Sequence, residues 1–476
     1  MVIAKKLVNQ RTHQTKRCEK EKTHQVNMLE GPLGKKILFF ALPLAGCSIL
    51  QQLFNSTDVA VVGRFSGSQA IAAVGSNGPL INLMVLLFTG LAVGANVLIS
   101  RYIGQREKEK ANEASHTVIL LSLICGVFLL LIGQFLSRPI LVLMNTPDDV
   151  IELASLYLRI YFLGMPFVMI YNFGSAILRS IGDTGRPLYC LIISGVVNVL
   201  LNLLFVVVFD MSVAGVGIAT VIADVVSAVL VMYYLFTENN EYIKINLKKI
   251  RFHKLHLKKM LMIGVPAGIQ GMVFSISNVF VQASINSLGS DAVAGSSVAL
   301  NFEYITYYII CAFSQTAVTF TSQNYGARKY DRCKKVFRLC MFFGCLICGI
   351  TGVIFIAGSN LFLSFFTDST EVAKYAFLRM AIVMLLEILT GSYEISCAAL
   401  RGLGHSLSPA VITIFGSVVF RIVWIYTVFN AYHDYCALLI VYPISWVLTG
   451  TAVTLAYFRV RKREFAKLKS KVIYNQ

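Results

Sequence analysis

Apolar stretches of about twenty residues recur along almost the whole chain, and they constrain the fold more than any other feature. A helix of that length crosses the hydrocarbon core of a bilayer, whereas β-barrel strands would be shorter and would alternate in polarity. Only 14% of the residues are charged, against about a quarter in soluble proteins. The sequence therefore predicts an all-α polytopic membrane protein that contacts the lipid bilayer along most of its length.

We expect twelve transmembrane spans. They cover residues 37–61, 79–100, 117–136, 158–179, 188–209, 213–236, 260–286, 298–321, 336–358, 377–400, 410–430 and 436–458. Lys and Arg gather in the two terminal segments and in the loops after the even-numbered spans, while the other loops hold few positive charges. Cytoplasmic loops of membrane proteins carry this excess of positive charge. Both termini are therefore expected to be cytoplasmic, and the net charge of +18 needs no nucleic-acid partner.

The chain also repeats itself, and four pairs of anchors keep an offset of 222–223 residues. The pairs are Pro43 and Pro266, Gly67 and Gly289, Gly104 and Gly326, and Arg179 and Arg401. Chance matches would not hold one offset over that distance. Because each half has six spans, the halves have the same topology and form two bundles around an axis along the membrane normal. We expect a V-shaped molecule with a central cleft.

Five regions follow from the spans and the repeat. Residues 1–35 are predicted to be a disordered basic cytoplasmic tail, and residues 36–236 the first bundle, here called the N-lobe. Residues 237–259 are a basic linker, residues 260–458 the second bundle or C-lobe, and residues 459–476 a basic cytoplasmic tail.

Polar side chains lie within the N-lobe spans. Gln51, Asn55 and Asp58 are spaced i, i+4, i+7 and are expected to share one helical face. Burying a carboxylate inside a membrane helix costs free energy, so its presence indicates a functional role for Asp58. Amides and hydroxyls in such helices also serve only to join neighbouring helices. The other candidates of this lobe are Asn172, Asn198, Asn202, Thr220 and Asp224.

A carboxylate in a cavity binds either a proton or a cationic solute, and competition for one site amounts to exchange. We hypothesise that Asp58 is protonated from outside and deprotonated toward the cytosol, and that it releases and rebinds substrate in alternation.

The C-lobe spans carry acids and one arginine. The candidates are Glu303, Glu387, Glu394 and Arg421, with Tyr307 beside Glu303. One interpretation is an internal ion pair between a glutamate and Arg421. The other is a second site for a cation, with Tyr307 and its neighbours Tyr304 and Tyr308 either offering aromatic faces or only packing.

Pro43 and Pro266 occupy matched positions and are predicted to kink the first and seventh spans. Cys345 and Cys348 lie in the middle of an apolar span without a nearby His or acid, which favours packing over a metal or redox site. We expect no cofactor and no structural metal, although Na⁺ is a possible transported ion. Since no Walker motif is present, ATP is not expected to drive the protein directly.

Several stretches resemble the multidrug and toxic compound extrusion (MATE) family of the wider MOP flippase superfamily over about residues 30–460. They read QQLFNSTDVAVVGR at 51–64, LRSIGDTGRP at 178–187, QNYGA at 323–327 and ALRGLG at 399–404. The resemblance implies twelve helices in two bundles and export of organic cations by antiport with H⁺ or Na⁺. It implies that Asp58 is the coupling acid of the first helix, after the bend at Pro43.

The resemblance also implies that Gln51, Asn172, Asn198 and Thr220 line the N-lobe cavity, as in the prokaryotic proton-coupled branch. The chain departs from that branch at Asn202, where the branch has a second Asp. Either Asp224 substitutes for that acid or coupling rests on Asp58 alone. The seventh span also lacks the acid of the Na⁺-coupled branch, and Glu303 or Glu394 would have to take its place.

The expected protein is a monomeric multidrug exporter of the bacterial plasma membrane that acts on small organic cations. A flippase for a lipid-linked or other metabolite is the first alternative, but the buried charges are mostly acidic and favour cationic solutes. An enzyme is not expected, because the spans hold no metal-protease or nucleophile-elbow motif. A receptor is a distant alternative, since the loops are too short for a ligand domain.

Overall fold

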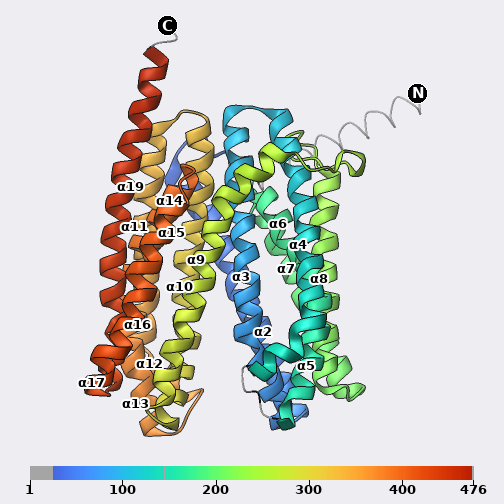
Figure 1. Cartoon of the computed structure of the whole chain (residues 1–476), viewed down its shortest axis with the longest axis vertical. Coiled ribbons are helices and arrows are strands. Elements are labelled where there is room, and N and C mark those ends of the chain that lie inside the picture. The colour runs from blue at the N-terminus through green and yellow to red at the C-terminus, as the bar shows by residue number, and fades with distance from the viewer. Residues whose placement is uncertain (1–24, 144–145, 147, 474–476) are drawn as a thin grey trace, which may run out of the picture.

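The computed structural model describes residues 25–143, 146 and 148–473, and every regular element within them is helical. The helices of the first half are α2 (Leu33–Phe65), α3 (Ser68–Gln105), α4 (Lys108–Leu143), α5 (Asp148–Leu163), α6 (Met165–Ser180), α7 (Gly185–Asn202), the π-helical η1 (Leu203–Val208) and α8 (Ser212–Thr237). They stand roughly parallel in Figure 1. The all-α fold predicted from the sequence is thus confirmed for these residues.

The second half begins after a short 3₁₀ turn, η2 (Leu247–Lys249). Its long helices are α9 (Lys254–Asn286), α10 (Ser290–Gly326), α11 (Tyr330–Ala357) and α19 (Val441–Ile473). Between α11 and α19 the chain forms shorter pieces. They are α12 (Ser359–Ser364), α13 (Thr370–Arg379), η3 (Met380–Met384), η4 (Leu385–Leu389), α14 (Thr390–Gly402), α15 (Leu407–Thr413), η5 (Ile414–Val419), α16 (Phe420–Trp424), η6 (Ile425–Phe429), α17 (Asn430–Tyr432) and α18 (Tyr435–Leu439).

In the described part of the chain, nine helices are long and apolar enough to cross a membrane, and a bent pair makes a tenth. The pair is α5 and α6, which meet at 45°. Pro166 stands at the start of α6, where a residue without an N–H fits the first turn of a new helix. The eighth and tenth predicted spans are outside this set, because α10 is rich in polar residues and the tenth is interrupted by η3 and η4. The count of twelve stays a prediction.

Backbone angles reproduce the internal repeat. Left-handed φ values occur at Gly67 (84°) and Gly289 (102°), and at Gly182 (93°) and Gly404 (94°). Glycine adopts such angles without the steric penalty of a Cβ. Arg106 (61°) and Arg328 (57°) are a further pair, and both follow a long helix. Each pair is separated by 222 residues, so the two halves turn their chains in the same way at the same places.

The first helix of each half crosses from one lobe to the other. Before Pro43, α2 packs on the C-lobe, where the rings of Phe40 and Phe320 are 5.3 Å apart. After Pro43 it packs on the N-lobe helix α7, through Gly46 against Leu188. Helix α9 does the reverse. It packs on the N-lobe helix α3 through Gly264 and Gly268, and beyond Pro266 it also contacts the C-lobe, where Arg401 donates to Gln270 at 2.7 Å. Pro43 lies inside the continuous helix α2, and Pro266 lies inside the continuous helix α9. A bend at either proline therefore stays a prediction.

The lobes meet tightly at one end, which we call the termini end because α2 begins and α19 finishes there (Figure 1). A Cβ on Gly90 would lie 2.2 Å from the backbone nitrogen of Gly268, and one on Gly104 would lie 2.0 Å from the carbonyl oxygen of Gln323. Only residues without side chains allow this approach. The Arg101 guanidinium also donates to the Gly402 carbonyl at 3.1 Å across the lobes.

The N-terminal segment differs from the prediction where the structure describes it. Residues 1–24 lie outside the described residues, but residues 25–32 follow a fixed path over the termini end rather than forming part of a disordered tail. The Val26 N–H donates to the Gly182 carbonyl at 3.0 Å, and Arg332 donates to the carbonyl of Met28, whose side chain is buried. Backbone hydrogen bonds and an apolar anchor therefore hold this segment on both lobes. At the other terminus, α19 extends through residues expected to form a tail.

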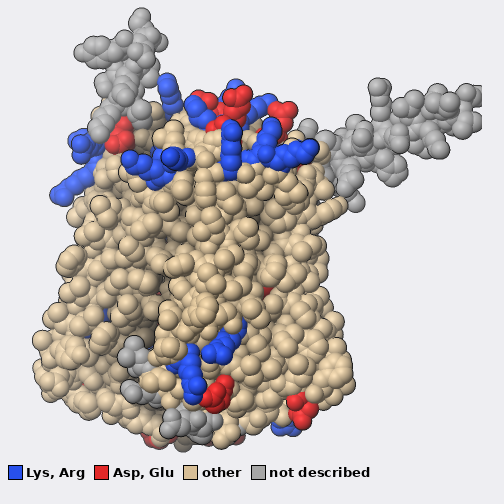
Figure 2. Space-filling model, turned by 45° about the vertical axis from the view of Figure 1, so that its right-hand side comes forward, with Lys and Arg blue, Asp and Glu red and all other residues tan. Residues whose placement is uncertain are grey.

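Lys and Arg side chains gather at the termini end, as Figure 2 shows, and a broad band of uncharged residues lies below them. This distribution is the one expected when that end faces the compartment of the positively charged loops.

Candidate functional site in the N-lobe and C-lobe

Asp58 lies on the second half of α2 and is buried, with 6% of its surface exposed. Its Oδ1 accepts a hydrogen bond from the Asn202 amide of α7 at 2.5 Å, and its Oδ2 accepts one from the Thr220 hydroxyl of α8 at 3.3 Å. Both partners are neutral. Within the described residues no lysine, arginine or histidine pairs with this carboxylate.

Asn198 completes the network one turn before Asn202. Its Oδ1 accepts from the Asn202 amide at 3.2 Å, and its own amide donates to the Thr220 hydroxyl at 3.4 Å. Three helices thus bring four of the predicted residues together: Asp58, Asn198, Asn202 and Thr220. The donors to the carboxylate are one amide, of Asn202, and one hydroxyl, of Thr220. Neutral donors of this kind orient a buried acid and leave its charge uncompensated.

The other predicted N-lobe residues lie apart from this network. Gln51 and Asn55 are exposed, although they share a helix with the buried Asp58. Among the residues that the structure describes, Asn172 donates only to the Val168 carbonyl of its own helix, at 2.9 Å. Asp224 is half-buried on α8 one turn beyond Thr220, and among the described residues no hydrogen bond joins it to Asp58.

In the C-lobe, Glu303 of α10 forms a buried ion pair with Arg379 of α13. The guanidinium donates two hydrogen bonds to the carboxylate, from Nε to Oε2 at 2.9 Å and from Nη2 to Oε1 at 3.2 Å. The two side chains are 12% and 3% exposed. This two-pronged geometry is the strong form of a carboxylate–arginine contact.

The predicted ion pair between a glutamate and Arg421 is wrong among the described residues. Arg421 is buried and lies over the rings of Tyr442 (4.5 Å) and Phe274 (4.9 Å), while its Nε donates to the Ser445 hydroxyl at 3.2 Å. Its Nη1 and Nη2 have no hydrogen-bond partner there. Aromatic faces stabilise the cation in place of a carboxylate.

The remaining C-lobe acids have hydroxyl partners. Glu387 is buried and accepts a hydrogen bond from Thr306, and Glu394 accepts one from the hydroxyl of Tyr307 at 3.4 Å. Tyr307 therefore serves as a hydrogen-bond donor to an acid. Its neighbour Tyr308 donates to Gln52 of the N-lobe at 3.2 Å, which is a contact between the lobes.

Sequence reasoning missed Arg379 and Gln52. Arg379 stands near the start of the tenth predicted span, at the membrane side opposite to the basic loops. A positive charge is unusual on that side, and this was the signal that could have marked Arg379. Gln52 follows Gln51, the first residue of the predicted stripe, and no sequence pattern distinguishes the two.

Comparison with known proteins shows which family this chain belongs to. The sequence profile described as MatE matches residues 43–204 and again residues 266–427. The two matches start at Pro43 and Pro266 and repeat the internal offset. Together they cover more than half of the chain.

Relatives and solved structures agree with the profile. "Probable multidrug resistance protein YoeA" of Bacillus subtilis (strain 168) is 30% identical over 387 residues, which are 80% of this chain and 84% of that protein. "Multidrug export protein MepA" of Staphylococcus aureus (strain NCTC 8325 / PS 47) is 22% identical over 398 residues, covering 83% and 88%.

A solved structure described as the outward-facing conformation of a multidrug resistance MATE family transporter of the MOP superfamily has the same fold. Its TM-score is 0.84 at 23% identity, and the match covers 94% of this chain and 99% of that one. With two profile matches and a relative at 30% identity, this chain belongs to the MATE family of membrane-spanning multidrug transporters.

Proposed function

We propose that the protein exports cationic, amphipathic organic compounds across the bacterial plasma membrane in antiport with H⁺ or Na⁺, and that Asp58 is the group for which the ion and the substrate compete. The buried carboxylate of Asp58, with only neutral partners among the described residues, carries this proposal. A buried carboxylate without a cation is costly, and binding a proton, a sodium ion or an organic cation removes that cost.

Alternating access requires that the lobes separate at one end while they meet at the other. The glycine contacts at the termini end support a state closed there. The excess of Lys and Arg at that end supports its assignment to the cytoplasmic side, with both termini cytoplasmic (Figure 2).

The proposal gives different roles to the two carboxylates of the N-lobe, Asp58 and Asp224. Asn202 cannot titrate, and Asp224 is not joined to Asp58 by a hydrogen bond among the described residues. Coupling in this protein therefore rests on Asp58, with Asn202 and Thr220 orienting it. The names of the two relatives, one a probable multidrug resistance protein and the other a multidrug export protein, support a broad range of substrates.

The test is efflux of a fluorescent organic cation from proteoliposomes, with a proton gradient and a sodium gradient imposed separately. We expect export under one of the gradients, and we expect Asp58→Asn to abolish it. Asp368→Asn is the matched control, because Asp368 is exposed in a loop and the substitution makes the same chemical change. Full gradient-driven export by Asp58→Asn would contradict the proposal.

Arg421 favours one second candidate, a flippase for a lipid-linked or other anionic metabolite. Its two buried guanidinium nitrogens, which have no hydrogen-bond partner among the described residues, would suit a phosphate or carboxylate group. If no organic cation moves under either gradient, transport of a lipid-linked pyrophosphate in the same liposomes tests this candidate. Arg421→Gln should then abolish that transport.

A further inference from the structure

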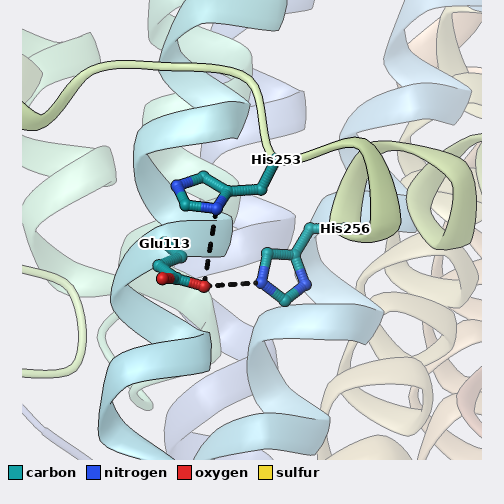
Figure 3. Close-up of side chains that lie close together, drawn as sticks. All are labelled: Glu113, His253 and His256. Atoms are coloured by element: carbon teal, nitrogen blue, oxygen red, sulfur yellow. Dashed lines mark hydrogen bonds and ion pairs between the residues drawn. The ribbon is translucent and has the colours of Figure 1, made fainter.

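A cluster of one glutamate and two histidines, Glu113, His253 and His256, lies where the first turns of α4 and α9 meet (Figure 3). Glu113 is on α4, His256 is in the first turn of α9, and His253 directly precedes that helix. The carboxylate of Glu113 points between the two imidazoles (Figure 3). The cluster therefore joins an N-lobe helix to the helix that opens the C-lobe.

We propose that Glu113, His253 and His256 form a binding site for a divalent transition metal ion of the zinc class. Glu113 Oε2 lies 3.1 Å from His256 Nε2 and 3.5 Å from His253 Nδ1. Two ligands of a tetrahedral zinc ion, each about 2.0–2.2 Å from the metal, lie about 3.3–3.5 Å apart. All three ligand atoms lie within 4.8 Å of one another, so a small rotation of one imidazole closes the third edge.

The ligand types match the proposed ion. Two imidazoles and one carboxylate are a zinc donor set that leaves the fourth position to water. The cluster opens into a pocket of about 510 Å³ lined by these residues together with Tyr102 and Gln105, which gives the ion and its water a path of entry.

Tyr102 supplies the outer contact that such sites require. Its hydroxyl lies 3.1 Å from Nδ1 of His256, which has 5% of its side chain exposed. When Nδ1 donates to this hydroxyl, Nε2 keeps its lone pair for a metal. Metal-bound histidines commonly use their second nitrogen in this way, and the contact fixes the ring. Tyr102 itself is buried and is held by the Lys259 ammonium at 3.4 Å.

Positively charged side chains near the cluster disfavour a metal cation there, and one of them must move before the metal binds. Lys110, Lys254 and Lys259 line the same pocket. Lys110 is paired with Glu107 at 3.0 Å, and the Nε of Arg251 donates to His253 Nε2 at 3.2 Å. For His253 to bind metal through Nδ1, its proton must lie on Nε2, so the Arg251 side chain must move away. Since this contact is exposed, its loss costs little.

A metal at this place would join α4 to α9 and so hold the termini end closed. We expected no structural metal from the sequence and did not consider these residues; Glu113 is 140 positions from His253, and the two histidines are i, i+3. Only the packing of the linker against α4 brings them together.

The test is equilibrium binding of zinc to the purified full chain, by calorimetry and by metal analysis after gel filtration, with cobalt absorption as a reporter of tetrahedral coordination. We expect one bound zinc ion per chain, a tetrahedral cobalt spectrum and a zinc-dependent rise in Tm. His256→Ala and Glu113→Gln should each weaken zinc binding at least about 10-fold, and Tyr102→Phe should weaken it by about the same factor. His433→Ala is the control and should bind zinc like the unaltered chain, because His433 lies in a loop outside the cluster.

Gel filtration shows whether each variant folds. If His256→Ala does not fold, the zinc affinity of His256→Asn is measured in its place. The absence of zinc binding by the unaltered chain would overturn the proposal. Equal binding by the unaltered chain and by both cluster variants would overturn it as well. Because none of these measurements uses transport, their outcome is independent of the proposed export.

Discussion

Asp58 is held by residues whose spacing in the sequence already suggested a group. Asn198 and Asn202 are i, i+4 on α7, and Thr220 follows on α8, so helical periodicity puts the two amides on one face. What the sequence could not give is which amide contacts the acid, since that depends on how α2, α7 and α8 pack. For the same reason it could not show that Gln51 and Asn55 are exposed while Asp58 is buried.

Asn202→Ala should destabilise the fold and weaken transport. The substitution removes a hydrogen bond to a buried carboxylate and leaves Oδ1 without its donor, a loss of about 1–3 kcal/mol in the free energy of unfolding. Thermal unfolding in detergent measures the effect. Asn172→Ala makes the same truncation at an amide that bonds only its own helix, and it should cost clearly less. Equal losses in the two variants would show that Asn202 has no special role at Asp58.

The acids of the C-lobe show the limits of sequence reasoning more sharply. One of the two interpretations left open by the sequence was an ion pair between a glutamate and Arg421, and Glu303 does have an arginine partner. The partner is Arg379 rather than Arg421, because α13 packs beside α10 whereas Arg421 is enclosed by aromatic rings. A pair from separate helices is specified by packing, which residue spacing does not encode.

Removing one member of the Glu303–Arg379 pair should be far more harmful than removing both. Glu303→Gln alone leaves a buried guanidinium without its carboxylate and should cost about 3–5 kcal/mol of unfolding free energy. The double variant Glu303→Gln with Arg379→Met should recover most of that loss. A double-mutant cycle on Tm and unfolding free energy provides the measurement, and strictly additive losses would contradict the buried pair.

At the scale of elements, α2 and α9 connect the lobes by crossing between them near their prolines. The sequence predicted that Pro43 and Pro266 were equivalent, but it gave no sign that the helix segments before them belong to the opposite lobe. That crossing depends on close contact at the termini end, where glycines of α3 face the backbone of α9. Periodicity reports which face of a helix is apolar, and it does not report the partner of that face.

Gly90→Ala should weaken the closed termini end. The added Cβ would lie 2.2 Å from the backbone of Gly268, so α3 and α9 must separate, at about 1–3 kcal/mol if the overlap is relieved as in other overpacked cores. Spin labels placed on the two lobes at this end should report a longer distance. In Gly75→Ala, on the same helix, the added Cβ meets no atom of the described residues within 4 Å, so the distance should stay unchanged. An unchanged distance in Gly90→Ala would mean that the glycine contact does not hold the lobes together.

At the scale of the whole molecule, the repeat was the most predictable property. The offset read from four sequence anchors returns in the paired φ values and in the two profile matches. Boundaries were less predictable: α5 and α6 bend where one straight span was expected, and α10 is too polar to stand out as a span. A helix that faces a partner lobe instead of lipid keeps its polar residues, so hydropathy alone underestimates it.

The measurement that tests the account most directly is the affinity of the purified protein for tetraphenylphosphonium as a function of pH and of sodium concentration. Because a proton or Na⁺ at Asp58 neutralises the charge that attracts the organic cation, the affinity should fall as pH falls or as sodium rises, whichever ion is coupled. In Asp58→Asn the affinity should be weaker and should respond to neither. If the Asp58→Asn variant keeps the pH or sodium dependence of the unaltered protein, the ion and the organic cation do not share Asp58, and the central claim is wrong.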